Sequence, residues 1–412
     1  MNRRLLEDIT IVDLTWVMAG PGATKLFNDL GARVIRIESN KTLDVLRTGC
    51  QRKNNDSFYK EGGWVFQDFN HDKLDIALNL KSPGGREVFE ELVKIADIVV
   101  CNYGVKAFRK LGLTFEDLSK IKEDIIVLNA SGLGDYGPYS SYITYAPSLM
   151  SVTGLIGLYG YEGADTPEMP TPLADYFGSL TLANYMLAAI EYRRRTGHGQ
   201  FVDVGQGDGV TAFLGPAIIS AQANGVKYGR IGNRDWSETC VPHNVYRCKG
   251  DDDWQWCAIA CAGEEEWQKL RGVIDPEDEW SGAEEFATHD ARLANVEALD
   301  EHILAWTAER TPEEVGRLCQ AAGVSGAPVQ TNYDLIHRDE HLRERGFFCS
   351  LDLEPEGKYP ENFEVTNMVA RMSNVERPVR FHHAPAWGEH TEYILKEILG
   401  KTQEWIDNNL IL

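Results

Sequence analysis

The feature that most constrains this chain is a repeated alternation of short apolar runs with helix-like segments. The first run, Ile9 to Leu14, is rich in β-branched residues, as is typical of a buried parallel strand. Gly20-Pro21-Gly22 and a helix-like segment follow, and Val34 to Ile37 forms a second strand-like run. The pattern predicts a strand–helix–strand unit of about 30 residues.

The alternation continues well beyond this first unit. Ser82 followed by Pro83 is a typical start of a helix, with the serine as N-cap and the proline in the first turn. Further strand-like runs occupy residues 76–80, 97–102, 125–129 and 200–204. Strands that alternate with helices predict an α/β fold with a Rossmann-like parallel sheet covered on both faces.

The middle of the chain has a different composition. A length of 412 residues corresponds to about two to three domains, and six of the ten tryptophans lie between residues 222 and 328. We therefore predict that a large α/β domain is split over both ends of the chain and that a smaller α+β domain lies between them. The expected boundaries are 1–205 and 330–412 for the large domain, 225–328 for the small domain, and 206–224 and 320–335 for the linkers.

Charge and cysteine content exclude several classes of function. The formal charge of −22 argues against a nucleic-acid partner, because binding phosphates requires a basic surface. No apolar run approaches the roughly 20 residues that span a membrane, and the N-terminal residues lack the pattern of a secretory signal. Eight scattered cysteines are typical of reduced thiols. We expect a cytoplasmic protein without a membrane partner.

The common catalytic and nucleotide-binding motifs are absent. The sequence contains no GxxxxGK[ST] loop, no GxGxxG fingerprint after the first strand and no GxSxG elbow. His337 and His341 are four residues apart but lack the HExxH glutamate and a third ligand, and Cys257 and Cys261 form only a weak CxxxC pattern. We therefore predict no metal site.

Asp175 is the carboxylate with the strongest functional signal. It falls in the first turns of a long apolar helix, predicted from Thr171 to about Arg195, where the helix dipole favours the ionised form. A desolvated carboxylate of this kind can act as a nucleophile. An ordinary aspartate at a helix start is the alternative. The residues expected on the buried side of this helix are Leu173, Phe177, Leu180, Leu187 and Ile190.

Nearly the whole chain resembles the class III CoA-transferases of the CaiB/BaiF type. The resemblance is carried, in order, by segments that include IVDLTWVMAGPGATKLFNDLGARVIRIE, LNLKSPGGREVFEELVKIADIVVCN, SGLGDYGPY, TPLADYFGSLTLANYMLAAIEYRRRTGHGQFVDV, IGNR, AAGVSGAPV and WGEHTEYILKEILG. It implies an enzyme that moves coenzyme A from an acyl-CoA donor to a carboxylic acid acceptor. Asp175 occupies the position of the family's catalytic aspartate, which forms an aspartyl-CoA thioester. Coenzyme A is then a substrate, with no permanently bound cofactor.

The resemblance also implies which residues contact coenzyme A. Three strand ends and one helix carry them, and the carboxyl ends of parallel strands meet at one edge of a sheet. The positions are Met18, Ala19, Leu78, Asn79, Leu80, Lys81, Asn102, Tyr103, Gly104 and Lys110.

Two alternative functions and the identity of the partners stay open in the sequence. An α-methylacyl-CoA racemase would have the same fold but requires a His-Asp pair where this chain has Tyr145-Ala146. A weakly active or inactive subunit of a heteromeric transferase is the other alternative, since residues 141–147 depart from the family pattern.

The resemblance implies an interlocked homodimer, or a heteromer with a homologous subunit. An apolar or aromatic acyl group is indicated by Trp16, Met18, Tyr145, Tyr159 and Tyr161, and an aromatic dicarboxylate such as benzylsuccinate is one candidate acceptor.

Overall fold

The structure is a computed structural model that describes residues 5–39, 42–48, 63–165, 171–352, 363–375, 377 and 380–409. The described residues form two compact units. The first unit is drawn from residues 1–156, 168–227 and 343–412, and the second from residues 157–167 and 228–342.

The first unit is built on a six-stranded parallel sheet with the order β3-β2-β1-β4-β5-β6. Its strands are β1 (Thr10–Asp13), β2 (Arg33–Glu38), β3 (Leu74–Ala77), β4 (Ile98–Cys101), β5 (Ile126–Asn129) and β6 (Gln200–Asp203). The predicted Rossmann-like parallel sheet is confirmed. The strand order reverses between β1 and β4, and ligands of such sheets bind where the loops after these two strands diverge.

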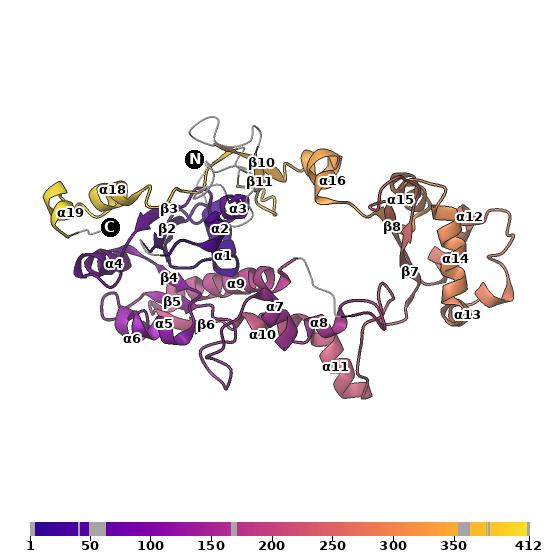
Figure 1. Cartoon of the computed structure of the whole chain (residues 1–412), viewed down its shortest axis with the longest axis horizontal. Helices are drawn as coiled ribbons and strands as arrows, with labels where there is room; N and C mark the ends of the chain where they lie inside the picture. Colours follow the sequence, from indigo (N-terminus) through magenta and orange to yellow (C-terminus); the bar gives the residue numbers. More distant parts are fainter. Residues whose placement is uncertain are drawn as a thin grey trace. The chain divides into compact units, whose positions relative to one another are not determined.

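Each face of the sheet is covered by helices. Alternate residues of one strand point to opposite faces, so Ile11 joins the core with α1 (Ala19–Asp29) and α9 (Leu173–Thr196), while Val12 joins the core with α4 (Pro83–Ile95). Figure 1 shows α1 and α9 together on one side of the sheet and α4 on the other. Ser82 caps α4 as predicted, because its hydroxyl accepts a hydrogen bond from the Gly85 backbone.

The buried face of α9 differs from our prediction. Leu180 and Leu187 are about half exposed, with relative exposures of 51% and 44%. The helix buries mainly small residues, listed here in order: Ala174, Gly178, Ser179, Leu182, Ala183, Met186, Ala189 and Ile190. The apolar side chains of α9 are distributed around its whole circumference. Their spacing in the sequence could therefore not identify the face that packs on the sheet. Small residues allow α1 and α9 to approach closely.

The C-terminal segment returns to the outer edge of the sheet. The Gly388 backbone donates a hydrogen bond of 2.6 Å to Asp75 of β3, and Arg47 donates one of 2.9 Å to the Pro385 carbonyl. Figure 1 shows this yellow segment beside the indigo strands, so both ends of the chain contribute to one unit. Residues 206–224, predicted as a linker, form α10 (Gln206–Phe213) and α11 (Gly215–Asn224) of this unit, and α10 buries Val210.

The second unit has a three-stranded antiparallel sheet and its own core. The strands are β7 (Cys240–Arg247), β8 (Trp256–Ala262) and β9 (Ser325–Pro328), in that order. Trp267 and Phe286 are fully buried in its core. The predicted linker 320–335 contains β9, which pairs with β8 and belongs to this unit.

The remaining elements complete the two units. Their bounds are α2 Val45–Thr48, α3 Trp64–Asn70, α5 Val105–Lys110, α6 Phe115–Leu118, α7 Ala146–Val152, α8 Leu155–Leu158, α12 Glu264–Ile274, η2 Glu284–Phe286, α13 His289–Ala294, α14 Val296–Thr307, α15 Pro312–Ala322, α16 Asn332–His337, α17 Glu340–Glu344, β10 Phe348–Asp352, β11 Glu364–Thr366, β12 Arg380–His382, α18 Thr391–Tyr393, η3 Ile394–Ile398 and α19 Gln403–Asn409. No described helix is both long and apolar enough to cross a membrane.

Candidate active site

A cavity of about 480 Å³ opens at the carboxyl edge of the large sheet and contains Asp175. Its walls come from the loops after β1 and β4, which diverge where the strand order reverses. Trp16 and Val17 contribute from the first loop, and Asn102, Tyr103 and Gly104 from the second. The topology therefore brings predicted coenzyme A contacts beside the predicted nucleophile.

Asp175 lies in the first turn of α9, which begins after Pro172 and not at the expected Thr171 cap. Burial raises the pKa of this carboxyl to about 6, while hydrogen bonds from the backbone N–H groups of Ala19 and of Asp175 itself act in the opposite direction. We predicted that the helix dipole would keep the group ionised, and burial is the larger influence. At pH 7 a carboxyl with this pKa still has roughly ten ionised copies for each protonated one.

Ser179 joins the starts of α1 and α9. Its hydroxyl oxygen lies 2.8 Å from the Ala19 carbonyl oxygen and 2.9 Å from that of Asp175, so its proton can be donated to either. A Cβ atom on Gly22 would lie 2.5 Å from this hydroxyl, and one on Gly20 would lie 2.3 Å from Thr15 Cβ. Gly22 therefore permits close packing of α1 on α9, which places the Ala19 amide next to Asp175, while Gly20 permits the first turn of α1 to pack against Thr15.

Asn102 ties the loop after β4 to the loop after β1. Its side-chain oxygen accepts a hydrogen bond of 3.1 Å from the Trp16 backbone, and its side-chain nitrogen donates one of 2.8 Å to the Trp16 carbonyl. The Tyr103 ring meets the Trp16 ring edge-on at 6.4 Å between centroids. Burial raises the pKa of the Tyr103 phenol, so this side chain stays neutral in the wall of the cavity.

A second cavity of about 350 Å³ shares Tyr103 as a wall with the first. Leu78, Asn79, Leu80 and Lys81 line it, together with Leu14 and Ile37. Two segments predicted to contact coenzyme A thus line two cavities on either side of one tyrosine.

Three predicted contacts lie outside the walls of both cavities. Met18 is the N-cap of α1 and Ala19 is its first residue, which reaches the site through its backbone. Lys110 is exposed at the last position of α5, whereas Lys106 of the same helix lines the Asp175 cavity. The sequence analysis did not identify Lys106. Lys106 lies four residues before Lys110, on the same face of the same helix, and this spacing was a recognisable signal.

The sequence analysis also did not identify Gln206 and Ser179 as residues of the site. Gln206 lines the Asp175 cavity and donates a hydrogen bond of 2.6 Å to the Ala130 carbonyl. Its place depends on how α10 packs against α9, which no local pattern shows. Residues 140–146 form one wall of the cavity, and they include most of the segment 141–147 that departs from the family pattern.

The described residues contain no group of three or more histidine, cysteine, aspartate or glutamate side chains suited to a metal ion. His337 and His341 lie in separate short helices, α16 and α17.

Residues 6–391 match the model of CoA-transferase family III, and the chain belongs to this family. It is an enzyme of the class III CoA-transferases. The chain is 29% identical to the succinyl-CoA–L-malate CoA-transferase beta subunit of Chloroflexus aurantiacus, over 98% of this chain and 96% of that protein. It is 28% identical to a formyl-CoA:oxalate CoA-transferase of Rhodopseudomonas palustris, over 96% and 94% of the two chains.

A solved structure agrees with this assignment. The crystal structure of a CaiB/BaiF family protein from Brucella suis superimposes with a TM-score of 0.83 at 25% sequence identity. The match covers 97% of this chain and all of that one.

Proposed function

We propose that Asp175 is the nucleophile of coenzyme A transfer. The observation that carries this proposal is a half-buried carboxylate with a pKa of about 6 in the wall of a 480 Å³ cavity, facing the backbone N–H of Ala19. Burial makes the carboxylate less solvated and more reactive, and the amide can stabilise charge that develops on an attacked carbonyl.

The chemistry balances without ATP. A carboxylate oxygen of Asp175 attacks the thioester carbonyl of the donor, the C–S bond breaks, and the thiolate leaves with the electron pair. The thiolate then attacks the aspartyl carbonyl of the mixed anhydride, releasing the donor acid and leaving an aspartyl-CoA thioester. The acceptor carboxylate reverses these two steps, which yields the acceptor thioester and regenerates Asp175.

The two cavities support one orientation of the substrate. The thioester lies in the Asp175 cavity, and the nucleotide end passes Tyr103 into the cavity lined by Leu78, Asn79, Leu80 and Lys81. Lys81 and Lys106 supply positive charge for the phosphates. Met18 and Lys110 remain contacts suggested by the family resemblance.

The acyl group and the partner are proposed from the lining and the relatives. Trp16 and Tyr145 line the Asp175 cavity, which supports an apolar or aromatic acyl group. Succinyl-CoA is the donor we favour, since similar proteins are named for succinyl-CoA, and benzylsuccinate remains a candidate acceptor. The family resemblance suggests an interlocked dimer with an identical or homologous chain, and relatives named as alpha and beta subunits support a homologous partner.

Two further points follow from the described residues. The lining of the Asp175 cavity contains no histidine, so the His-Asp pair of a racemase lacks support. The seven described cysteines are free thiols, which supports the proposed cytoplasmic location.

Covalent trapping tests the role of Asp175. The protein is incubated with succinyl-CoA, treated with hydroxylamine or borohydride, digested and analysed by mass spectrometry. We expect a modified peptide at Asp175 and a loss of transfer activity of at least about 1,000-fold in Asp175→Ala.

Asp208→Ala is the matched control, because Asp208 is also in the first turn of its helix but is exposed. It should retain activity and the adduct. An adduct on another residue, or full activity in Asp175→Ala, would contradict the proposal.

A further inference from the structure

The loop between β1 and α1, residues Thr15 to Val17, has every backbone N–H bonded to a side chain. Thr15 donates to Asp13 at 2.9 Å and Trp16 to Asn102 at 3.1 Å, while Val17 donates to Asp44 at 3.0 Å. The side chains come from the ends of β1 and β4 and from the segment after β2. Two of the three groups that hold the loop, Asn102 and Asp44, are therefore distant from it in sequence.

Val17 has an unusual backbone conformation. Its φ of 64° lies in the left-handed region, which β-branched residues adopt at a steric cost. Such a conformation persists only where the surrounding structure enforces it. Met18 and Ala19 follow directly, so the conformation of Val17 sets where the first turn of α1 begins.

Asp44 is placed to enforce this conformation. Its side chain is about 1% exposed, and Oδ2 accepts hydrogen bonds from Val17 N at 3.0 Å and from Arg36 Nη2 at 2.7 Å. Its Oδ1 accepts from Leu46 N at 2.9 Å, which fixes the carboxylate to the start of α2.

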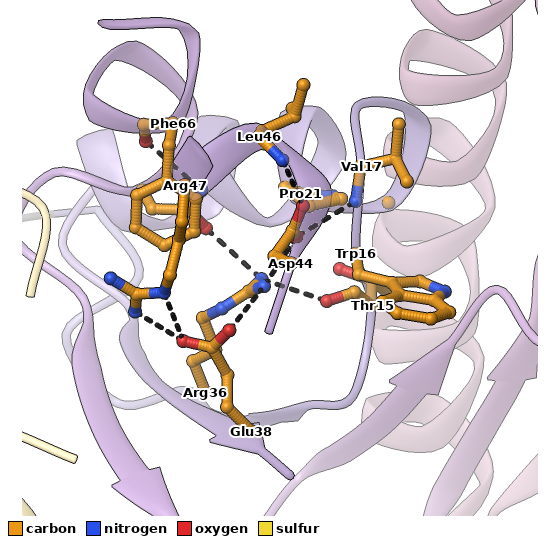
Figure 2. Close-up of polar contacts among 12 residues, drawn as sticks. Thr15, Trp16, Val17, Pro21, Arg36, Glu38, Asp44, Leu46, Arg47 and Phe66 are labelled. Carbon is orange, nitrogen blue, oxygen red and sulfur yellow. Dashed lines mark hydrogen bonds and ion pairs between the residues drawn. The ribbon is translucent and has the colours of Figure 1, made fainter. Parts of the chain in front are cut away.

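Arg36 completes the attachment from β2. Its Nη1 donates to the Thr15 carbonyl at 2.8 Å, so the Arg36–Asp44 pair holds both ends of the three-residue loop. Figure 2 shows the Arg36 guanidinium pointing toward both Thr15 and Asp44, with Val17 on the far side of the Asp44 carboxylate. The guanidinium carbon of Arg36 lies 5.2 Å from the centre of the Phe66 ring.

We propose that Asp44 is a positioning residue for coenzyme A transfer: through Val17 it holds the first turn of α1 so that the Ala19 amide faces Asp175. Asp44 is absent from the walls of the Asp175 cavity, although its neighbour Val45 lines it. The inference rests on the proposed role of Asp175.

The test compares two buried, ion-paired aspartates: Asp44, which bonds Val17 just before α1, and Asp29, the last residue of α1. In Asp44→Asn one carboxylate oxygen becomes an NH₂ group, which cannot accept a hydrogen bond from a backbone N–H. The hydrogen bond from Val17 or the one from Leu46 is therefore lost. Asp29→Asn is the control, because Asp29 is 8% exposed, pairs with Lys25 at 3.0 Å and His71 at 2.8 Å, and is the last residue of α1.

Each variant is incubated with succinyl-CoA, and the rate of adduct formation at Asp175 is followed by mass spectrometry. We expect Asp44→Asn to lower the maximal rate about 10- to 100-fold, because small misplacements of catalytic groups have effects of this size. The succinyl-CoA concentration at half-maximal rate should change less than about threefold. The acid limb of the rate should move to higher pH, since the Ala19 amide no longer favours the carboxylate. Asp29→Asn should show neither effect.

Hydrogen exchange provides a readout that is independent of activity. Peptides covering residues 15–22 should exchange faster in Asp44→Asn than in the wild type, while Asp29→Asn leaves them protected. Where Asp44→Asn is poorly folded, both variants are compared in a Val17→Gly background, which removes the left-handed strain.

The two proposals fail in different ways. If the wild type forms no adduct at Asp175, the proposed function is wrong. If the wild type forms the adduct and Asp44→Asn keeps the wild-type rate, pH dependence and exchange pattern, Asp44 is not a positioning residue. Equal losses of rate in Asp44→Asn and Asp29→Asn would likewise overturn the inference.

Discussion

At the scale of single residues, Asp175 combines reactivity with a cost in stability. Its pKa of about 6 lies above the ordinary value of 3.8 because the half-buried side chain is desolvated. The folded protein therefore binds this proton more tightly than the unfolded chain does. Functional groups in desolvated sites often reduce stability in this way.

Asp175→Asn should therefore stabilise the protein in a pH-dependent manner. The stabilisation by the proton is fully present below the ordinary pKa of 3.8 and is lost as the pH rises through about 6. A neutral asparagine avoids this loss, so the free energy of unfolding should rise by about 1–3 kcal/mol at pH 7 and little at pH 4. Urea unfolding at both pH values measures the difference.

The exposed Asp208 provides the comparison. Asp208→Asn should change stability by less than about 0.5 kcal/mol at either pH. An equal gain for Asp175→Asn at pH 4 and pH 7 would mean that packing, and not the buried charge, causes the effect.

At the scale of elements, the site depends on the close approach of the starts of α1 and α9. Gly22 permits it, because Gly22 packs against Ser179 of α9, and the Ser179 hydroxyl bridges the two helices. The Ser82 cap and the strand–helix alternation were predictable, because they depend on neighbouring residues. The contact between α1 and α9 was not, because it joins positions about 160 residues apart.

Gly20→Ala should disturb the packing of the first turn of α1 against Thr15 in the preceding loop. The added Cβ would lie 2.3 Å from the Cβ of Thr15, which is itself buried, so backbone or side chains must shift. We expect a loss of about 1–3 kcal/mol in the free energy of unfolding, measured in urea.

Gly215→Ala is the matched control, because a Cβ there meets nothing within 4 Å and the residue begins a helix. It should be neutral or slightly stabilising. A Gly20→Ala variant as stable as this control would show that the first turn of α1 can shift at little cost.

At the scale of the whole molecule, a net charge of −22 opposes the approach of an anionic substrate. Local cations must offset this field where coenzyme A enters. Lys106 lines the Asp175 cavity and Lys81 lines the second one. The position of these two lysines at one sheet edge results from the parallel topology.

Lys81→Ala and Lys106→Ala should each raise the dissociation constant for coenzyme A about three- to tenfold at low ionic strength. The difference from the wild type should shrink as salt is added, because mobile ions screen exposed charges. Isothermal titration calorimetry at two salt concentrations measures both effects.

Lys120→Ala is the control, because Lys120 pairs with Asp117 and lines neither cavity. The dissociation constant of Lys120→Ala for coenzyme A should match that of the wild type. If all three variants bind coenzyme A equally well, the phosphates are bound elsewhere.

The sequence by itself determined the order of strands and helices along the chain and the place of Asp175 at the start of a long apolar helix. These features depend on local periodicity and helix caps, which act over a few residues. Only the tertiary structure decided that Leu180 and Leu187 are exposed, that Lys106 lines the cavity and that Asp44 holds Val17 in a left-handed conformation. These features depend on contacts between distant segments, because close packing and burial, rather than local preference, select the partners of each side chain.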